Sequence, residues 1–453
     1  PNEGMTEIYL IGNPPYGGAK KLKAAQKEDY NYAFNDRPYS KNLDYIALWF
    51  IKGAAYISRT QAQLAFVSTN SVTQGEHVGL MFPMIFEMGL EIGYAYRSFK
   101  WENNAKHNAG VTVVVISLRN VANKIKYLYS EHVRTQATNI NGYLIDADNV
   151  FISRRKQPLT QSLPAMNFGS MPRDGGNLIL SETDLTDLRN TDPQAERFVK
   201  SYCGAKDFIE GNQRYCLWIT DSQAQEAEES PWISRRLRAV SEYRQDSDTS
   251  PSTAKYADRP HLFVQRAYRP TDSIIVPSVS SELRRYVPIG YLGADTVISN
   301  SAFAVYDAEP WLFALLTSRM HMVWLRAVGG KMKTDYRYSN TLVYNNFPAP
   351  PITDQIKESL TQCAFRVLDV REYHCEYTLA ELYDADKMPE NLRRAHADLD
   401  IVLDRIYRKR PFDSDEERLR LLFDLYRQMT NQEASAQQAA KPTRESRRTR
   451  KVQ

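Results

Sequence analysis

A short segment near the start of the chain, Asn13 to Tyr16, combines side chains that could grip a planar amine. Its two consecutive prolines have fixed φ angles and no N–H donors, so neighbouring carbonyls stay free to accept hydrogen bonds. The amide of Asn13 carries a donor and an acceptor in one plane, and the ring of Tyr16 offers a flat stacking surface. The apolar run Ile8 to Ile11 before it is typical of a buried strand. The pattern indicates an active-site loop.

The segment Asn13-Pro14-Pro15-Tyr16 resembles the (D/N/S)PP(Y/F) motif of amino-methyltransferases that use S-adenosylmethionine, chiefly the adenine-N6 DNA methyltransferases. An adenine amine is a poor nucleophile because its lone pair is delocalised into the ring. The resemblance implies that the Asn13 side-chain oxygen and the Pro14 carbonyl accept from both N–H groups and localise that lone pair, without a general base or a metal. A structural Pro-Pro turn is the alternative for the motif alone.

Length and composition set the class of protein. The 453 residues have room for about two to four domains, and a formal charge of +4 is too small to identify a nucleic-acid binder. The four cysteines show no metal-ligand spacing with the seven histidines, so we expect a reduced, cytoplasmic setting and no metal site. We find no signal peptide and no apolar run of bilayer length, and we therefore expect no membrane association.

Helical and strand patterns alternate over the first 120 residues. Apolar periodicity predicts helices over 43–59 and within 74–88, and apolar runs predict strands over 63–69, 90–99 and 111–118. Helices between strands indicate a parallel or mixed α/β sheet with helices on its faces, which the resemblance identifies as part of a Rossmann-like class I methyltransferase sheet. The lysine-rich stretch 17–42 is predicted to be a mobile lid or, equally, a solvated surface loop.

The remaining chain changes character twice. Basic and aromatic residues alternate through its middle, which suits a nucleic-acid-facing domain, although solvated surface charge explains any single cluster at least as well. Helical apolar spacing follows over 356–377, 392–407 and 414–429. We therefore expect the C-terminal half of a catalytic domain over 1–130, an α+β target-recognition domain over 131–350, a helical bundle over 351–434 and a basic, disordered tail over 435–453.

Three further stretches resemble parts of the same methyltransferases. Leu43 to Phe50 is similar to the helix after the catalytic loop, and Ala65 to Ser71 is similar to the strand that comes next. Ser98 to Asn103 resembles the motif whose aromatic residue sandwiches a flipped base, since a base in duplex DNA must leave the stack before it can be methylated. Phe99 and Trp101 are both candidates for that second stacking face, and each could instead be a core aromatic.

The order of these segments narrows the family further. The resemblance extends roughly from residue 8 to residue 430. Gly204 to Ile209, Arg214 to Ile219 and Tyr344 to Pro348 resemble the MmeI-like family (type IIL), fused restriction-modification proteins in which one recognition domain serves both activities. The resemblance implies duplex DNA as the partner. It leaves open whether a nuclease accompanies the methyltransferase.

Within the recognition domain, Ser280 to Arg285 is the segment predicted to read bases. Glu282 can accept from a cytosine amine and Arg284 can donate twice to guanine, and their spacing on a strand would put both on one face. Arg285 is a further candidate, and a surface ion pair is the equal alternative. Phosphate contacts, which supply affinity without sequence information, are predicted for five other basic residues, namely Arg266, Arg269, Lys331, Lys333 and Arg337.

The resemblance implies S-adenosylmethionine as cofactor, bound by a glycine-rich loop that comes before the Asn-Pro-Pro-Tyr segment. Only twelve residues precede Asn13, and no such loop is found later. We therefore expect a fragment that lacks an N-terminal methyltransferase segment, and with it the ability to methylate alone. A non-catalytic DNA-binding specificity module with a separate cofactor-binding partner is the alternative. A glutamine-amide methyltransferase is a third interpretation, although it would not need a long basic and aromatic domain.

Overall fold

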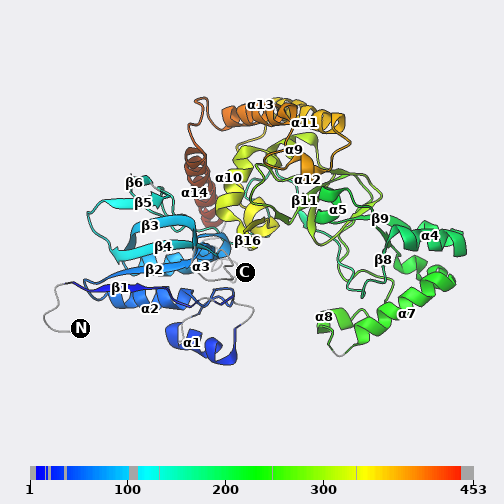
Figure 1. Ribbon diagram of the computed structural model, residues 1–453, viewed down its shortest axis with the longest axis horizontal. Helices are drawn as coiled ribbons and strands as arrows, with labels where there is room; N and C mark the ends of the chain where they lie inside the picture. The colour runs from blue at the N-terminus through cyan, green and yellow to red at the C-terminus, as the bar shows by residue number, and fades with distance from the viewer. Residues whose placement is uncertain are drawn as a thin grey trace, which may run out of the picture.

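The computed structural model describes residues 7–15, 17–18, 22–34, 38–101, 111–131, 133–246, 248–332 and 334–439 (Figure 1). A strand-rich N-terminal part lies at the left of the view, a mixed middle part extends to the right, and C-terminal helices run along the top. None of the helices in these ranges is long and apolar enough to span a membrane. The predicted α/β class with a recognition part and a helical C-terminal part is confirmed.

The N-terminal part is built on a six-stranded sheet with the strand order β1-β2-β4-β3-β5-β6. Its strands are β1 (Tyr9–Gly12), β2 (Gln63–Thr69), β3 (Leu90–Trp101), β4 (Val111–Asn120), β5 (Lys126–Ser130) and β6 (Val133–Ala137). Strands β1 and β2 are parallel, whereas β4 runs antiparallel to both β2 and β3. The sheet is therefore mixed, as predicted, and β1, β2 and β3 all end at the same edge.

Helices α2 (Ala47–Ile57) and α3 (Gly75–Glu87) contact each other and cover one face of this sheet. Alternate residues of β2, among them Leu64 and Phe66, are buried beneath α2, as expected for a strand with one covered face. A Cβ added at Gly53 of α2 would lie 2.2 Å from Leu64 Cδ1, so this glycine lets the helix approach the strand closely.

Strand β1 is an exposed edge strand, and the prediction of a buried strand is wrong. Tyr9 is 56% exposed and Ile11 is 81% exposed. The strand pairs on one side only, with β2, among the residues that the structure describes. Apolar composition predicted burial because it does not distinguish a central strand from an edge strand.

A helix occupies much of the stretch predicted as a lid or solvated loop. Helix α1 (Ala24–Phe34) buries Tyr30 and Phe34, whose rings pack with Tyr39 at centroid distances of 5.3 and 4.9 Å. The Tyr30 hydroxyl donates to the Leu43 carbonyl at 2.8 Å. Both loop predictions are therefore wrong for residues 24–34, because an aromatic cluster fixes a helix whose sequence is mostly polar.

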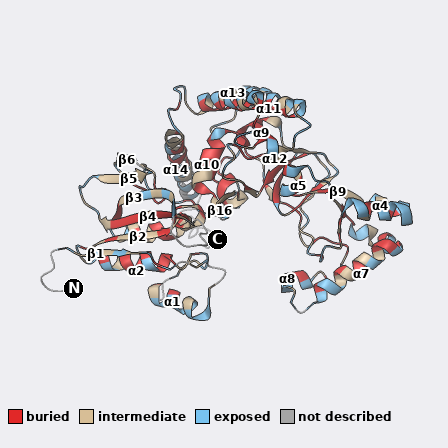
Figure 2. Cartoon of the chain, viewed as in Figure 1, coloured by how far each residue is buried: buried red, intermediate tan, exposed pale blue. Residues whose placement is uncertain are grey.

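The middle part contains three small sheets, with strand orders β14-β9-β10-β8, β13-β11-β15-β7 and β12-β17-β16. The strands are β7 (Asn167–Phe168), β8 (Ile179–Leu180), β9 (Val199–Cys203), β10 (Tyr215–Leu217), β11 (Ser273–Pro277), β12 (Val279–Ser280), β13 (Gly290–Leu292), β14 (Thr296–Ile298), β15 (Ala302–Tyr306), β16 (Gly330–Met332) and β17 (Asp335–Arg337). The helices are α4 (Glu182–Thr191), α5 (Ala205–Glu210), α6 (Ala224–Glu228), α7 (Pro231–Gln245) and α8 (Pro251–Ala254). Figure 2 shows that buried residues line the inner side of α7, which extends far from the N-terminal sheet.

The C-terminal part is helical, as predicted. Helices α9 (Pro310–Leu316) and α10 (Arg319–Val328) still belong to the middle part, and the C-terminal helices are α11 (Asp354–Tyr373), α12 (Leu379–Leu382), α13 (Glu390–Tyr407) and α14 (Asp415–Ala439). Helices α11 and α13 pack together, whereas α14 leaves this pair and packs against α10 (Figure 1). Helix α14 extends to Ala439, so the first residues of the predicted disordered tail are helical, and residues 440–453 lie outside the described residues.

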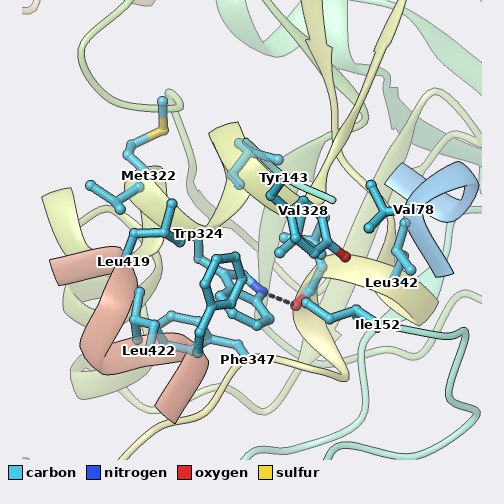
Figure 3. Close-up of a cluster of buried hydrophobic side chains, with 14 of the residues drawn as sticks. Val78, Tyr143, Ile152, Met322, Trp324, Val328, Leu342, Phe347, Leu419 and Leu422 are labelled. Atoms are coloured by element: carbon cyan, nitrogen blue, oxygen red, sulfur yellow. Dashed lines mark hydrogen bonds between the residues drawn. The ribbon is translucent and has the colours of Figure 1, made fainter. Parts of the chain in front are cut away.

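One hydrophobic core joins the three parts (Figure 3). Val78 of α3, Trp324 of α10 and Leu422 of α14 belong to the same cluster of buried side chains. The indole N–H of Trp324 donates to the Val343 carbonyl at 3.0 Å, which satisfies the polar atom of the largest fully buried side chain. The recognition part and the sheet are therefore held in a fixed relation by packing.

A buried histidine in this core predicts a loss of stability in acid. His321 is fully buried against Phe347 and contacts the Tyr338 hydroxyl at 2.8 Å, and burial lowers its pKa from 6.5 to about 3. Because only the unfolded state takes up this proton below pH 6.5, stability is lost as the pH falls from 6.5 towards 3. We expect a cost of roughly 2 kcal/mol at pH 5 from this group. Urea unfolding at pH 7 and pH 5 should show a smaller difference for His321→Gln than for the natural protein, and an equal difference would contradict this.

Candidate active site and recognition surface

Strand β1 delivers Asn13, Pro14 and Pro15 to the edge where β1, β2 and β3 end. Pro14 is buried, whereas Asn13 and Pro15 are exposed. Tyr16, the predicted stacking residue, lies outside the described residues. The exposed Asn13 is therefore followed directly by a buried proline that packs into the protein.

A cavity of about 840 Å³ opens beside this loop. Asn13 and Pro15 line it, together with the large aromatic side chains of Trp49 of α2 and Tyr32 of α1. The Lys52 ammonium lies 3.8 Å from the centre of the Tyr32 ring, a cation–π contact that joins α1 to α2 across the cavity wall. The cavity therefore combines flat aromatic walls with a few polar groups, as small-molecule sites do.

Two residues that the sequence analysis did not single out anchor the loop. Asp44 Oδ1 accepts from the Gly17 N–H at 3.2 Å and from the Ile46 N–H at 3.3 Å. The Asp44 N–H donates to His77 Nε2 at 3.1 Å. Burial lowers the pKa of His77, which keeps the ring neutral and able to accept this hydrogen bond. The Gly17 carbonyl also accepts from the Tyr45 N–H at 3.2 Å, so both main-chain groups of Gly17 are held where the chain leaves the loop.

The two candidate aromatics for stacking lie near the end of β3. Trp101 is 39% exposed, and its ring centre is 6.4 Å from that of Phe99. Strands β2 and β4 separate β3 from β1, which places the strand ends roughly 14 Å apart at the usual spacing of about 4.8 Å per strand. The structure therefore puts both aromatics at the same edge as Asn13 without bringing either into the cavity wall.

The predicted base-reading residues lie in a turn, and the prediction that Glu282 and Arg284 share one face of a strand is wrong. Strand β12 ends at Ser280, and the Arg284 N–H closes the turn on the Ser281 carbonyl at 3.2 Å. Leu283 at its tip is 73% exposed, and Arg285 is exposed as well. We call residues 281–285 the recognition turn.

An ion pair ties the recognition turn to its own small sheet. Lys331 Nζ of β16 lies 3.2 Å from Glu282 Oε2 and 5.4 Å from the centre of the Tyr336 ring. Glu282 is thus both a predicted base reader and a member of the alternative ion pair. A Cβ added at Gly75, where α3 begins with φ +58°, would lie 3.4 Å from Gly330 Cα. The small sheet β12-β17-β16 therefore touches α3, the helix that follows β2 in the N-terminal sheet.

The predicted phosphate contacts lie in different surroundings. The Arg266 guanidinium covers the Trp218 ring at 4.1 Å and donates to the Ile219 carbonyl at 3.0 Å, beside a cavity of about 420 Å³. Arg269 lies 5.7 Å from the centre of the Tyr306 ring. Arg337 is exposed on β17. Lys333 lies outside the described residues. Arg266 thus lies in a loop segment, whereas Arg337 lies on a strand of a small sheet.

A mixed sheet with an Asn-Pro-Pro loop at the end of a strand, followed by a recognition part, defines a DNA-methyltransferase type of architecture. Three family models match consecutive ranges: the MmeI DNA-methyltransferase domain over residues 1–130, the MmeI target recognition domain over residues 146–351 and the MmeI C-terminal domain over residues 352–433. The chain therefore belongs to the MmeI family of restriction-modification proteins.

Two relatives support this assignment. DNA methyltransferase A of Bacillus subtilis (strain 168) is 43% identical over 431 residues, which are 95% of this chain and 49% of that protein. The solved structure of the type IIL restriction-modification enzyme MmeI in complex with DNA is 33% identical and superposes with a TM-score of 0.86 over 94% of this chain and 57% of that one. The chain thus spans about half the length of both relatives.

Proposed function

We propose that this chain forms the target-base side and the DNA-recognition part of a DNA methyltransferase. The enzyme would transfer a methyl group from S-adenosylmethionine to adenine N6 in duplex DNA. The observation that carries the proposal is the anchored loop at Asn13, which presents a side-chain amide and two prolines at the carboxyl end of a strand, beside an aromatic-walled cavity. Membership of the MmeI family supports the same reaction class.

The loop would act on the amine through two acceptors. Asn13 Oδ1 and the Pro14 carbonyl would accept one N–H each, which localises the nitrogen lone pair on the side that faces the methyl donor. Pro15 removes a competing N–H donor from the same turn. The Asp44 and His77 contacts hold the loop in place before substrate arrives, so little reorganisation is needed during the reaction. In this proposal Tyr16 stacks on one face of the extruded adenine, and Phe99 or Trp101 on the other.

The described residues fit the amine side of the site but not the whole cofactor site. They do not supply the glycine-rich turn and ribose-binding carboxylate that the resemblance implies for S-adenosylmethionine. The open edge of β1, with Tyr9 and Ile11 exposed beside the cavity, is suited to receive further strands. We propose that a segment upstream of residue 1 pairs there and holds the cofactor, whose sulfonium carbon supplies the methyl group.

The recognition turn would read bases while basic residues hold the backbone. Glu282 and Arg284 would contact base edges in the major groove, and Arg285 would assist. Lys331 and Arg337 lie on the same small sheet as β12, and Arg266 and Arg269 lie on another segment of the recognition part, so that together they would contact phosphates along the duplex. The close approach of Gly75 to Gly330 supports a constant spacing between the base that would be read and the base that would be methylated.

The test is a methyl-transfer assay with the natural full-length protein, plasmid DNA and S-adenosylmethionine labelled in the methyl group. We expect label in the DNA, and we expect none when residues 1–453 are used alone. Label in protein would instead support methylation of glutamine, and no label at all with the full-length protein would overturn the proposal. Label transferred by residues 1–453 alone would show that the cofactor side is not upstream.

A further inference from the structure

The chain becomes fully buried as soon as it leaves the recognition turn. Arg285 is exposed, yet Tyr286 is 8% exposed and Val287 only 2%. The side chains that surround this exit come from the C-terminal helices, which follow it by about a hundred residues. The conformation of an exposed turn is set by how its two ends are held. The exit of the turn is therefore a place where distant helices act on base recognition.

Two residues on one face of α13 hold Tyr286. Its ring stacks on that of His396 at a centroid distance of 4.1 Å and an interplanar angle of 16°. Its hydroxyl donates to Asp400 Oδ2 at 2.6 Å. His396 and Asp400 are four residues apart on the helix, so both side chains point to the same side. The other carboxylate oxygen of Asp400 accepts from the Arg319 N–H at 2.7 Å, where α10 begins.

A second hydrogen-bonded chain holds the same segment three residues later. Arg371 of α11 donates from Nη1 to the Ile289 carbonyl at 2.6 Å and from Nε to the Tyr383 hydroxyl at 2.7 Å. That hydroxyl has its own proton left for His396 Nε2, at 2.8 Å. Arg371, Tyr383 and His396 are all buried. Both ends of the short segment 286–289 are therefore fixed to α11 and α13 by polar contacts that water does not weaken.

We propose that Tyr286 and Asp400 are positioning residues for DNA sequence recognition, through which the C-terminal helices set the placement of Glu282 and Arg284. This inference rests on the proposed function, because it requires the recognition turn to read bases. Neither residue touches DNA in this account. The hydroxyl-to-carboxylate contact fixes the exit of the turn, and the Glu282 to Lys331 ion pair fixes its middle. Loss of the first contact would let the reading side chains shift while the fold is kept.

The test compares Tyr286→Phe with Tyr291→Phe in the full-length protein. Each change removes one hydroxyl and keeps the ring, and Tyr291, whose hydroxyl donates to the Ala308 carbonyl at 3.3 Å, has no role at the turn. The readout is the ratio of methylation at the recognised sequence to methylation at its single-base variants, mapped by sequencing modified DNA. We expect Tyr286→Phe to lower this ratio three- to tenfold at one or two base positions and Tyr291→Phe to leave it unchanged.

A double-mutant cycle separates positioning from general destabilisation. In a protein that already carries Glu282→Ala and Arg284→Ala, Tyr286→Phe should have no further effect on discrimination, because nothing is left to position. An equal effect in both backgrounds, or unchanged discrimination by Tyr286→Phe in the natural protein, would overturn the inference. If Tyr286→Phe does not fold, Asp400→Asn takes its place in the same cycle. Absence of DNA methylation by the natural protein would count against the proposed function instead.

Discussion

Asn13→Ala in the full-length protein is expected to lower the rate of methyl transfer by roughly 10²- to 10³-fold, the usual effect of removing one preorganised hydrogen-bonding group from an active site. The substitution removes the acceptor for one N–H of the amine and leaves the Pro14 carbonyl in place. It does not alter the contacts of Asp44 with the loop, so the backbone should keep its course. The measurement is the single-turnover rate at saturating DNA and S-adenosylmethionine.

Asn13→Asp is the matched control. Aspartate keeps an oxygen at the same position and belongs to the motif that the segment resembles, so we expect it to retain far more activity than alanine. DNA affinity should be nearly the same for both variants and the natural protein, because the proposed contacts to bases and phosphates lie in the recognition part and are unchanged. If the alanine and aspartate variants lost activity equally, the side-chain oxygen of Asn13 would not be the acceptor.

Arg244→Met is expected to destabilise the recognition part by roughly 3–5 kcal/mol. Arg244 is fully buried in α7 and donates to five main-chain carbonyls at 2.7–3.1 Å, those of Pro172, Arg173, Tyr256, Arg259 and Leu262. Methionine removes a buried charge, whose desolvation lowers the pKa of the arginine, and that change is favourable. The carbonyls of Pro172, Arg173 and Leu262 would then lose their donor, at about 1 kcal/mol or more each, and this cost is the larger. The carbonyls of Tyr256 and Arg259 keep main-chain N–H donors.

The control for Arg244→Met is Arg238→Met, on the exposed side of the same helix. We expect the free energy of unfolding of that variant to lie within about 0.5 kcal/mol of that of the natural protein. Amide hydrogen exchange locates the effect. Arg244→Met should increase exchange at residues 256–265, because this segment supplies three of the carbonyls that the guanidinium contacts, and should leave exchange in α2 unchanged. Equal exchange at 256–265 in both variants would show that the five contacts do not hold that segment.

The extent to which the sequence predicted this fold depended on how local each signal was. The run of β-branched residues in β4 correctly predicted a strand, because such residues favour extended backbone in a sheet. The same reasoning failed for β1, because burial of a strand depends on whether a neighbour lies on each side. Helix α1 has a mostly polar sequence, and Tyr30 and Phe34 pack against Tyr39, which lies five residues beyond the end of the helix. Helical periodicity does not register a contact with a residue outside the helix.

In the candidate site, too, residues with a local sequence signal were predicted and residues that act through contacts between separate segments were not. Asn13 to Pro15 was predicted because the whole signal lies in adjacent residues. Asp44 and His77 were not, since Asp44 lies just before α2 and His77 lies in the first turn of α3, and they meet the loop only in the folded chain. The strand predicted at Glu282 to Arg284 ends early because the buried Tyr286 turns the chain inward. Long-range contacts of this kind determine geometry that spacing does not encode.

The most direct test of the account is the identity of the methylated base. DNA modified by the full-length protein with labelled S-adenosylmethionine would be digested to nucleosides and separated, with Asn13→Ala as the background. We predict that the label elutes as N6-methyl-2′-deoxyadenosine and that it is lost in the alanine variant. Label in a cytosine nucleoside, or label in adenine that persists in Asn13→Ala, would contradict it.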